Sequence, residues 1–145
     1  MNFSITLASW PVQCSAARDV RTEVFLVEQR IPVELEWDDM DGVCLHAVAM
    51  NDTGQAIGTG RLLPDGHIGR MAVKKSARGF GIGGAILETL MQQSQQTGHP
   101  CVMLNAQLQV VPFYERHGFV PEGEEFLDAG IPHIHMRHVF DLVKI

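Results

Sequence analysis

Residues 70–87 read RMAVKKSARGFGIGGAIL and join an apolar, strand-like stretch to a glycine-rich turn and the start of a helix. Glycine permits backbone conformations with positive φ and lets a ligand approach without a Cβ in the way. Free backbone amides at a helix N-terminus, together with the helix dipole, form a site for an anion. Arg78 adds a positive charge beside the turn. We therefore expect a pyrophosphate here; the alternative is a turn that only changes the direction of the chain. The expected ligands are the backbone amides of Gly79, Phe80, Gly81, Ile82, Gly83 and Gly84.

Two familiar phosphate-binding motifs do not fit this turn. A P-loop requires a lysine followed by serine or threonine after the glycines, and none follows here. Gly79, Gly81 and Gly84 match GxGxxG, but a dinucleotide-binding fold needs an acidic residue at the end of the next strand. That strand ends in LNAQ, at residues 104–107. A nucleotide-dependent oxidoreductase is therefore a disfavoured alternative.

Hydrophobic periodicity on both sides of the turn predicts an alternation of strands and helices. An acidic, proline-containing stretch at residues 30–42 is expected to form a loop or a short helical piece. The order predicts a single α/β domain over residues 1–145 around a mixed sheet. Strands are expected near residues 3–7, 44–50, 56–63, 67–73, 101–106, 119–126 and 131–140, and helices near 11–29, 82–97 and from Pro112 to Gly118.

Composition narrows the class of protein. The chain has 145 residues and a net charge of −6, which argues against a nucleic-acid partner. Its three cysteines are far apart and form no CxxC pair, so neither a disulfide framework nor a zinc ribbon is expected. The cysteines are typical of a reducing compartment. The first residues show no signal peptide, and no apolar run reaches the length of a membrane span. We expect a cytoplasmic protein without a metal site.

Two motifs together resemble the GNAT superfamily, the GCN5-related N-acetyltransferases. Residues 78–83, RGFGIG, match the family pattern [QR]xxGx[GA] between a strand and a helix, and residues 113–119, FYERHGF, match its late FYExxGF helix. The stretches VFLVEQRIP, DDMDGVCLH, IGTGRL and GIPHIHM resemble the ElaA-like branch. One departure concerns an asparagine that the family usually carries seven residues before the tyrosine. Gln107 stands at that position here, while Asn105 lies two residues earlier.

The resemblance implies a GNAT fold, an α/β fold with a mixed sheet of about seven strands and about four helices. This fold binds acetyl-CoA where two central strands separate. Met71, Ala72 and Val73 would then pair with the pantetheine through their main chain, and the glycine turn would hold the pyrophosphate. The next strand, around Asn105, would border the other side of the cleft. A backbone N–H near Val73 would polarise the thioester carbonyl.

The resemblance also places the general acid of the family at Tyr114, where it would protonate the departing CoA thiolate. The alternative is an aromatic ring that only packs on the sheet. The general base is not identified by the sequence.

The acceptor side of the site is less defined. The stretch VELEWDDMDG, residues 33–42, contains Glu34, Glu36 and Asp38, which could attract an ammonium group or supply the base. The alternative is a solvated acidic loop. His133, after a Gly-Ile-Pro turn, is a further candidate on the substrate side.

These observations predict an enzyme that transfers the acetyl group of acetyl-CoA directly to a primary amine. A non-catalytic acyl-CoA-binding or sensing domain is the competing interpretation. The acceptor could be a small molecule or a protein amine, and a homodimer is possible. We expect neither a nucleic acid nor a membrane as partner.

Overall fold

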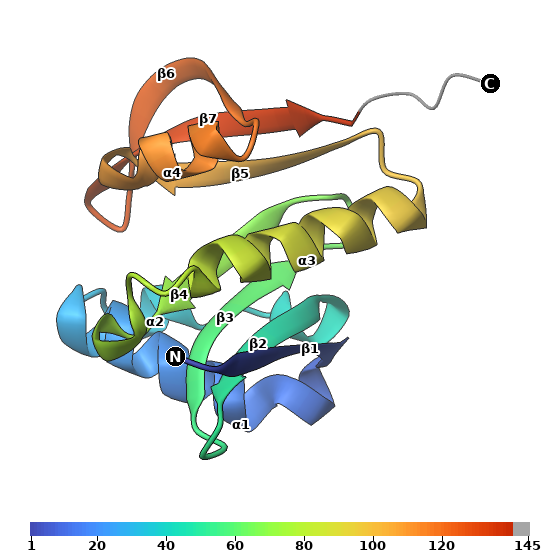
Figure 1. Cartoon of the computed structure of the whole chain (residues 1–145). Coiled ribbons are helices and arrows are strands. Elements are labelled where there is room, and N and C mark those ends of the chain that lie inside the picture. The colour runs from blue at the N-terminus through green and yellow to red at the C-terminus, as the bar shows by residue number, and fades with distance from the viewer. Residues whose placement is uncertain (141–145) are drawn as a thin grey trace.

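The computed structural model describes residues 1–140 and contains seven strands and four α-helices (Figure 1). The strands are β1 (Phe3–Ser9), β2 (Leu45–Asn51), β3 (Ala56–Leu62), β4 (Ile68–Val73), β5 (Cys101–Gln107), β6 (Val120–Asp128) and β7 (Ile131–Val139). The α-helices are α1 (Trp10–Arg21), α2 (Val33–Glu36), α3 (Ile82–Thr97) and α4 (Val111–Arg116). A π-helix, η1 (Thr22–Glu28), continues α1, and short 3-10 turns lie at Asp41–Val43, Lys75–Ala77 and Leu108–Val110.

Local signals in the sequence account for the ends of the main helices. Ser9 is the N-cap of α1, with a proline in the first turn, where the missing N–H costs no hydrogen bond. Gly98 ends α3 in the left-handed conformation, and its amide bonds back to the carbonyl groups of Gln95 and Ser94. The expected bounds of α3, residues 82–97, are confirmed.

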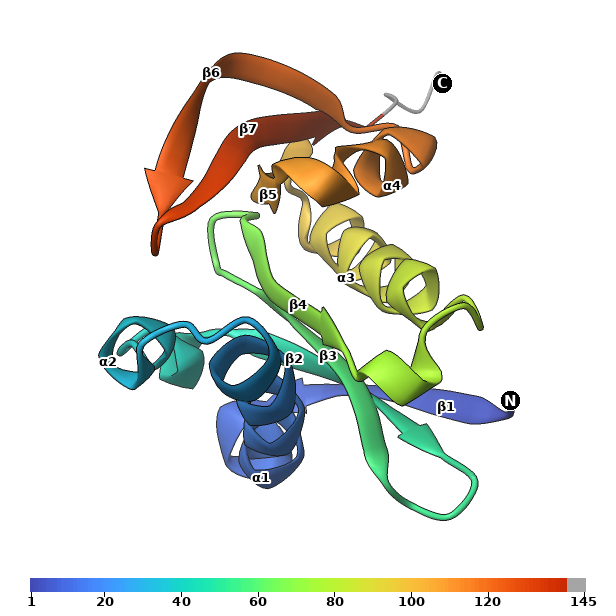
Figure 2. The same ribbon diagram turned by 90° about the vertical axis from the view of Figure 1, so that its left-hand side faces the viewer.

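The strands form two antiparallel sections rather than one continuous sheet. The first has the order β1-β2-β3-β4, and the second has the order β5-β7-β6. Between β4 and β5 there is one isolated parallel bridge, His67 to Met103, and the amide of Met103 bonds to the carbonyl of Gly66 at 3.3 Å. The two sections therefore meet at one end and separate along the rest of β4 and β5 (Figure 2).

Helices cover the strands on both sides (Figures 1 and 2). The main hydrophobic cluster joins α3 and α4 to both sections of the sheet and includes Ile86, Leu90, Leu104 and Met136, all at most 2% exposed. A second cluster packs α1 and η1 against β2–β4, with Val20 at its centre. Since residues of both sections share the main cluster, burial holds the sections together where hydrogen bonds do not.

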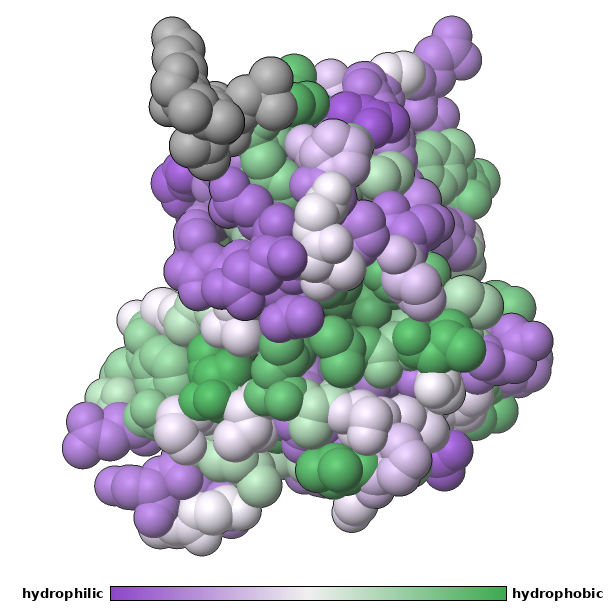
Figure 3. Space-filling model, turned by 90° about the vertical axis from the view of Figure 1, so that its right-hand side faces the viewer, coloured by the Kyte–Doolittle hydropathy of each residue, from purple (hydrophilic) through white to green (hydrophobic). Residues whose placement is uncertain are grey.

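The surface mixes hydrophilic and hydrophobic side chains. In Figure 3 the upper part, which carries the second section of the sheet, is mostly hydrophilic, while hydrophobic side chains gather in the lower part. Across residues 1–140, no helix is both long and apolar enough to cross a membrane.

Candidate active site

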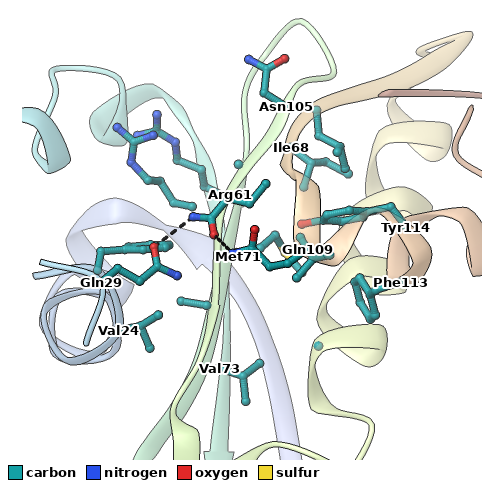
Figure 4. Close-up of a pocket in the computed structure, with 18 of the residues that line it drawn as sticks. Val24, Gln29, Arg61, Ile68, Met71, Val73, Asn105, Gln109, Phe113 and Tyr114 are labelled. Atoms are coloured by element: carbon teal, nitrogen blue, oxygen red, sulfur yellow. Dashed lines mark hydrogen bonds between the residues drawn. The ribbon is translucent and has the colours of Figure 1, made fainter. Parts of the chain in front are cut away.

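A cleft of about 1230 Å³ opens where β4 and β5 separate. It is lined by η1, α2, β4, the glycine turn, the N-terminus of α3, β5 and α4 (Figure 4). The structure therefore brings together segments that are far apart in the sequence. Of the residues predicted for the site, the cleft is lined by Glu36, Met71, Ala72, Val73, Arg78, Gly79, Gly81, Ile82, Gly83, Gly84, Asn105, Tyr114 and His133.

Three predicted residues do not line the cleft: Glu34, Asp38 and Phe80. The side chain of Phe80 is 48% exposed, and Glu34 is also exposed. The prediction for Phe80 concerned its backbone amide, and the exposure of its side chain does not bear on that amide.

Strand β4 presents a free edge to the cleft. It pairs with β3 on one side, while on the side of β5 the described residues form only the bridge at His67. Arg70 has a φ of 49°, and the register of β3 and β4 shifts at this point. This bulge turns the following residues, Met71 to Val73, so that their main chain lies along the cleft.

The glycine turn lies at the other end of this edge and leads into α3. Gly81 is the N-cap of α3 with a φ of 79°, a conformation that is strained for residues with a Cβ. Gly83 has an ordinary φ and lies against Phe113 and Val73, at 3.6 and 3.7 Å from the position of a Cβ. No side chain caps the helix, so its first amide groups are available to an anion.

Arg78, expected to assist the anion, forms a bidentate ion pair with Glu28 of η1 at 2.7 and 2.8 Å. It also donates to the carbonyl of Val73 at 3.0 Å. The hydrogen bonds from Arg78 hold the pKa of the Glu28 carboxyl below its ordinary value. Arg78 thus links η1 to β4. An anion bound at the turn would share the positive charge of Arg78 with Glu28.

Tyr114 lies on α4 with its ring packed edge-on against Phe113 and Phe119. Burial raises the pKa of Tyr114 to about 12, so its hydroxyl stays protonated at neutral pH. The hydroxyl has no hydrogen-bond partner within residues 1–140. It is nevertheless accessible to solvent, because in that range the only fully buried side-chain polar atom without a partner is Arg61 Nε. Figure 4 shows it pointing into the cleft toward β4. The Tyr114 hydroxyl is therefore protonated and faces the cleft.

Three glutamines form a hydrogen-bonded chain across the cleft, which the sequence did not predict. Gln107 of β5 donates to Gln29, just after η1, at 3.0 Å, and Gln109 donates to Gln107 at 2.6 Å (Figure 4). Asn105 lines the cleft beside them and accepts a hydrogen bond from His135 at 2.9 Å. The sequence shows that Gln107 stands where the family usually has asparagine, but it does not show that Gln107 bonds to Gln29.

Two carboxylates of the acidic segment, residues 33–42, are buried rather than solvated. Glu36 is 3% exposed and Asp41 is 5% exposed, because buried arginines neutralise them. Arg21 bonds to both carboxylates at 2.8 Å. Arg61 bonds to Asp41 and to Asp38 at 2.8 Å.

Arg70 completes this network. It contacts Glu36 at 3.3 Å and Asp38 at 3.2 Å. Burial raises the pKa of Glu36, and Arg70 and Arg21 oppose this change. The expectation that Glu36 and Asp38 offer free negative charge to an ammonium group is therefore corrected: three arginines balance Glu36, Asp38 and Asp41.

Comparison with known proteins identifies the class of this protein. The acyl-CoA N-acyltransferase of Pseudomonas aeruginosa has the same fold, with a TM-score of 0.85, 34% identity, and coverage of 95% of this chain and 100% of that one. ElaA of Escherichia coli superposes with a TM-score of 0.83 and 25% identity, covering 94% and 99% of the two chains. The fold therefore defines an acyl-CoA-dependent N-acyltransferase.

Sequence comparison assigns the family. A model described as "Acetyltransferase (GNAT) domain" matches residues 17–140, and the chain belongs to this family, in its ElaA-like branch. The Bacillus subtilis (strain 168) protein described as "Uncharacterized N-acetyltransferase YjcF" is 43% identical over 121 residues, which cover 81% of this chain and 86% of that protein. The protein is accordingly an acyl-CoA-dependent N-acetyltransferase.

Proposed function

We propose that the protein transfers the acetyl group of acetyl-CoA directly to a primary amine. The observation that carries this proposal is the convergence of three elements on one cleft: the free edge of β4, the glycine turn at the start of α3, and the Tyr114 hydroxyl. Each of these elements suits a different part of acetyl-CoA.

The cleft suits acetyl-CoA in shape and in chemistry. The uncapped amides at the start of α3 can bind the pyrophosphate, and the helix dipole adds about half a positive charge. The unpaired main chain of Met71–Val73 can bond to the amides of the pantetheine as a neighbouring strand would. An N–H group near Val73 can stabilise negative charge on the thioester oxygen.

Tyr114 would supply the proton that the leaving sulfur needs. A phenol whose pKa burial raises to about 12 remains a donor throughout the neutral range. A positioned general acid contributes roughly 10²- to 10⁴-fold to a reaction rate.

The acceptor is a primary amine of a small molecule or a protein. The arginine network removes the reason to expect a strongly cationic acceptor, because the carboxylates of Glu36 and Asp38 are already paired. The lining of the cleft combines apolar side chains such as Ile31 and Leu35 with polar ones such as Asp128. This mixture favours an amine with an apolar body over a polyamine.

We place the protein in the cytoplasm. All three cysteines, Cys14, Cys44 and Cys101, are free thiols, as in proteins of reducing compartments.

Two measurements test the proposed function. Acetyl-CoA should stabilise the protein, by about 2.7 kcal/mol at a concentration of 100 times its dissociation constant. Incubation with acetyl-CoA and a panel of primary amines should release free thiol. Stabilisation without thiol release from any amine would favour the competing interpretation, a domain that binds acyl-CoA without turning it over. No stabilisation by millimolar acetyl-CoA would contradict the whole proposal.

A further inference from the structure

A protonated amine cannot attack a thioester, so the proposed reaction also requires a base. His133 lies near the start of β7, lines the cleft and is 8% exposed. Its Nδ1 lies 2.6 Å from the carbonyl oxygen of Ile131. Because a carbonyl only accepts, Nδ1 must carry the proton, and the neutral ring then has its lone pair on Nε2. The backbone thus fixes the tautomer that a general base needs.

The Nε2 atom of His133 is free to receive a proton. It forms no hydrogen bond or ion pair with any residue of the range 1–140. It is accessible to solvent, because the only fully buried side-chain polar atom without a partner in that range is Arg61 Nε. The ring stacks on Phe126 of β6, with centroids 5.9 Å apart and an interplanar angle of 25°. Two contacts, the carbonyl and the aromatic ring, therefore hold the imidazole in place without occupying Nε2.

The register of the sheet places His133 and Tyr114 on opposite faces. Leu104 pairs with Met136 across β5 and β7, and both belong to the core beneath α3 and α4, together with Tyr114. Gln107 pairs with His133, and side chains in this register point to the other face. On that side Gln107 bonds to Gln29, which follows η1. The cleft is therefore reached by an acid from one face and by His133 from the other.

Two other titratable groups near His133 are already engaged. The carboxylate of Glu36 accepts from Arg21 and contacts Arg70, and His135 lies between Asn105 and Glu122.

No charged side chain forms a hydrogen bond or an ion pair with the His133 ring within the described residues. Its neighbours from each adjoining strand are Gln107 of β5, Phe126 of β6 and the Ile131 carbonyl. The charged groups that line the same end of the cleft are Asp128 of β6 and, on the opposite wall, Arg70 with Glu36.

We propose that His133 is the general base of the acetyl transfer, an inference that rests on the proposed function. Its Nε2 takes a proton from the acceptor ammonium, and the neutral amine attacks the thioester carbonyl carbon. The new C–N bond forms, the C–S bond breaks, and Tyr114 gives a proton to the departing sulfur. The second proton lost by the attacking nitrogen returns to Tyr114 through water. The proton on His133 passes to solvent, so each turnover releases one proton.

The variant His133→Asn tests this role, because the asparagine amide can still donate to the Ile131 carbonyl but carries no base. Two probe acceptors separate proton removal from binding. Butylamine is protonated at neutral pH, whereas the terminal nitrogen of butanoic hydrazide is already neutral. We expect kcat with butylamine to fall by at least about 10²-fold, within the range of a lost general base. Transfer to the hydrazide and the thermal shift with acetyl-CoA should stay nearly unchanged.

His138→Asn is the matched control. His138 lies on the same strand and its Nδ1 also contacts a carbonyl, that of Gly118 at 2.9 Å, but it does not line the cleft. Equal losses with both probes, or no loss with butylamine, would overturn the role of His133 as base. If the wild-type protein binds acetyl-CoA but transfers to neither probe nor any amine, the proposed function itself fails.

A measurement on the wild-type protein does not depend on how the variant folds. The ¹⁵N chemical shifts of the His133 ring should show a protonated Nδ1 and an unprotonated Nε2 in the neutral form. The value of kcat/KM should fall toward acid pH, because a general base must be unprotonated to act. The opposite tautomer, or a profile without an acid limb, would contradict the proposal.

Discussion

The side chains of Gln107 and Gln29, 78 residues apart in the sequence, meet across the cleft in a hydrogen bond of 3.0 Å. Gln107 belongs to β5 in the second section of the sheet, and Gln29 follows the π-helix that packs on the first section. Their bond therefore joins the two halves of the molecule at the point where the strands have separated (Figure 4).

Replacing Gln29 by alanine should weaken this connection. A typical intramolecular hydrogen bond contributes about 1 kcal/mol to the free energy of unfolding, so Gln29→Ala should lower it by about that amount. Urea denaturation measures the loss. Gln96→Ala, an exposed position on α3, is the control and should have little effect. Equal stability of the two variants would show that the bridge does not hold the halves together.

Replacing Tyr114 by phenylalanine should remove the proton donor but keep the packing of the ring. We expect kcat to fall by about 10²- to 10⁴-fold at pH 7, with little change in acetyl-CoA affinity or melting temperature. Thiol release under single-turnover conditions measures the chemical step directly.

The size of the Tyr114 effect should depend on the leaving group and on pH. The CoA thiolate is itself a moderately good leaving group, and protonation of the sulfur helps less as the pH rises. The variant should therefore be compared with the wild type near pH 7, where protonation helps most. A Phe variant that folds and retains the wild-type chemical step at this pH would reduce Tyr114 to a packing residue.

Gly83 allows the glycine turn to be tested without backbone strain. Its φ is ordinary, and an added Cβ would meet Phe113 and Val73 only at van der Waals distances of 3.6 and 3.7 Å. Gly83→Ala should therefore fold and serve as the control. Gly83→Asp places a carboxylate in the first turn of α3, which favours the helix but repels a pyrophosphate. Calorimetry should show lost acetyl-CoA binding for the Asp variant alone; equal binding by both would place the phosphate site elsewhere.

The ion pairs of the acidic segment should make the protein sensitive to acid. Hydrogen bonds from Arg61 lower the pKa of Asp38 below its ordinary value of 3.8. Burial raises the pKa of Asp41, but Arg21 and Arg61 together lower it by more, so this pKa is also below 3.8. A depressed carboxyl pKa stabilises the folded state above the unfolded value and loses that effect as the pH falls through the folded value. The melting temperature should therefore drop below about pH 4.

The variant Asp38→Asn isolates one of these contributions. It should be less stable than the wild type at pH 6. The difference should shrink as the pH falls below about 4, because the Asp38 carboxyl of the unfolded chain then becomes protonated. A difference in melting temperature that stays constant over this range would mean that the Asp38 charge does not contribute.

The sequence predicted the features that depend on local chemistry. The turn around Gly81 and the end of α3 at Gly98 follow from the backbone conformations that glycine permits, and the structure confirms both. The order of strands and helices is confirmed for the same reason, because periodicity reports which residues face the core. The placement of Tyr114 in the cleft followed from the resemblance, not from periodicity.

Features that join distant segments could not be predicted. Glu36 and Asp41 look solvated in the sequence because their partners are distant along the chain. Arg21, which pairs with both, belongs to α1, and Arg61, which also pairs with Asp41, belongs to β3. The separation of β4 from β5 is likewise invisible, since each strand has an ordinary pattern and only their mutual distance differs. The tautomer of His133 depends on a backbone carbonyl whose position requires the fold.

The free edge of β4 also has a consequence for how the protein behaves in crowded solution. A row of unpaired N–H and C=O groups is a template for the strand of another chain, and proteins that leave such rows open risk edge-to-edge association. Here the row lies inside a cleft, and the bulge at Arg70 interrupts it. A bound acyl-CoA would complete the row as a strand does. The supply of this metabolite would then set not only the rate of the enzyme but also its resistance to aggregation.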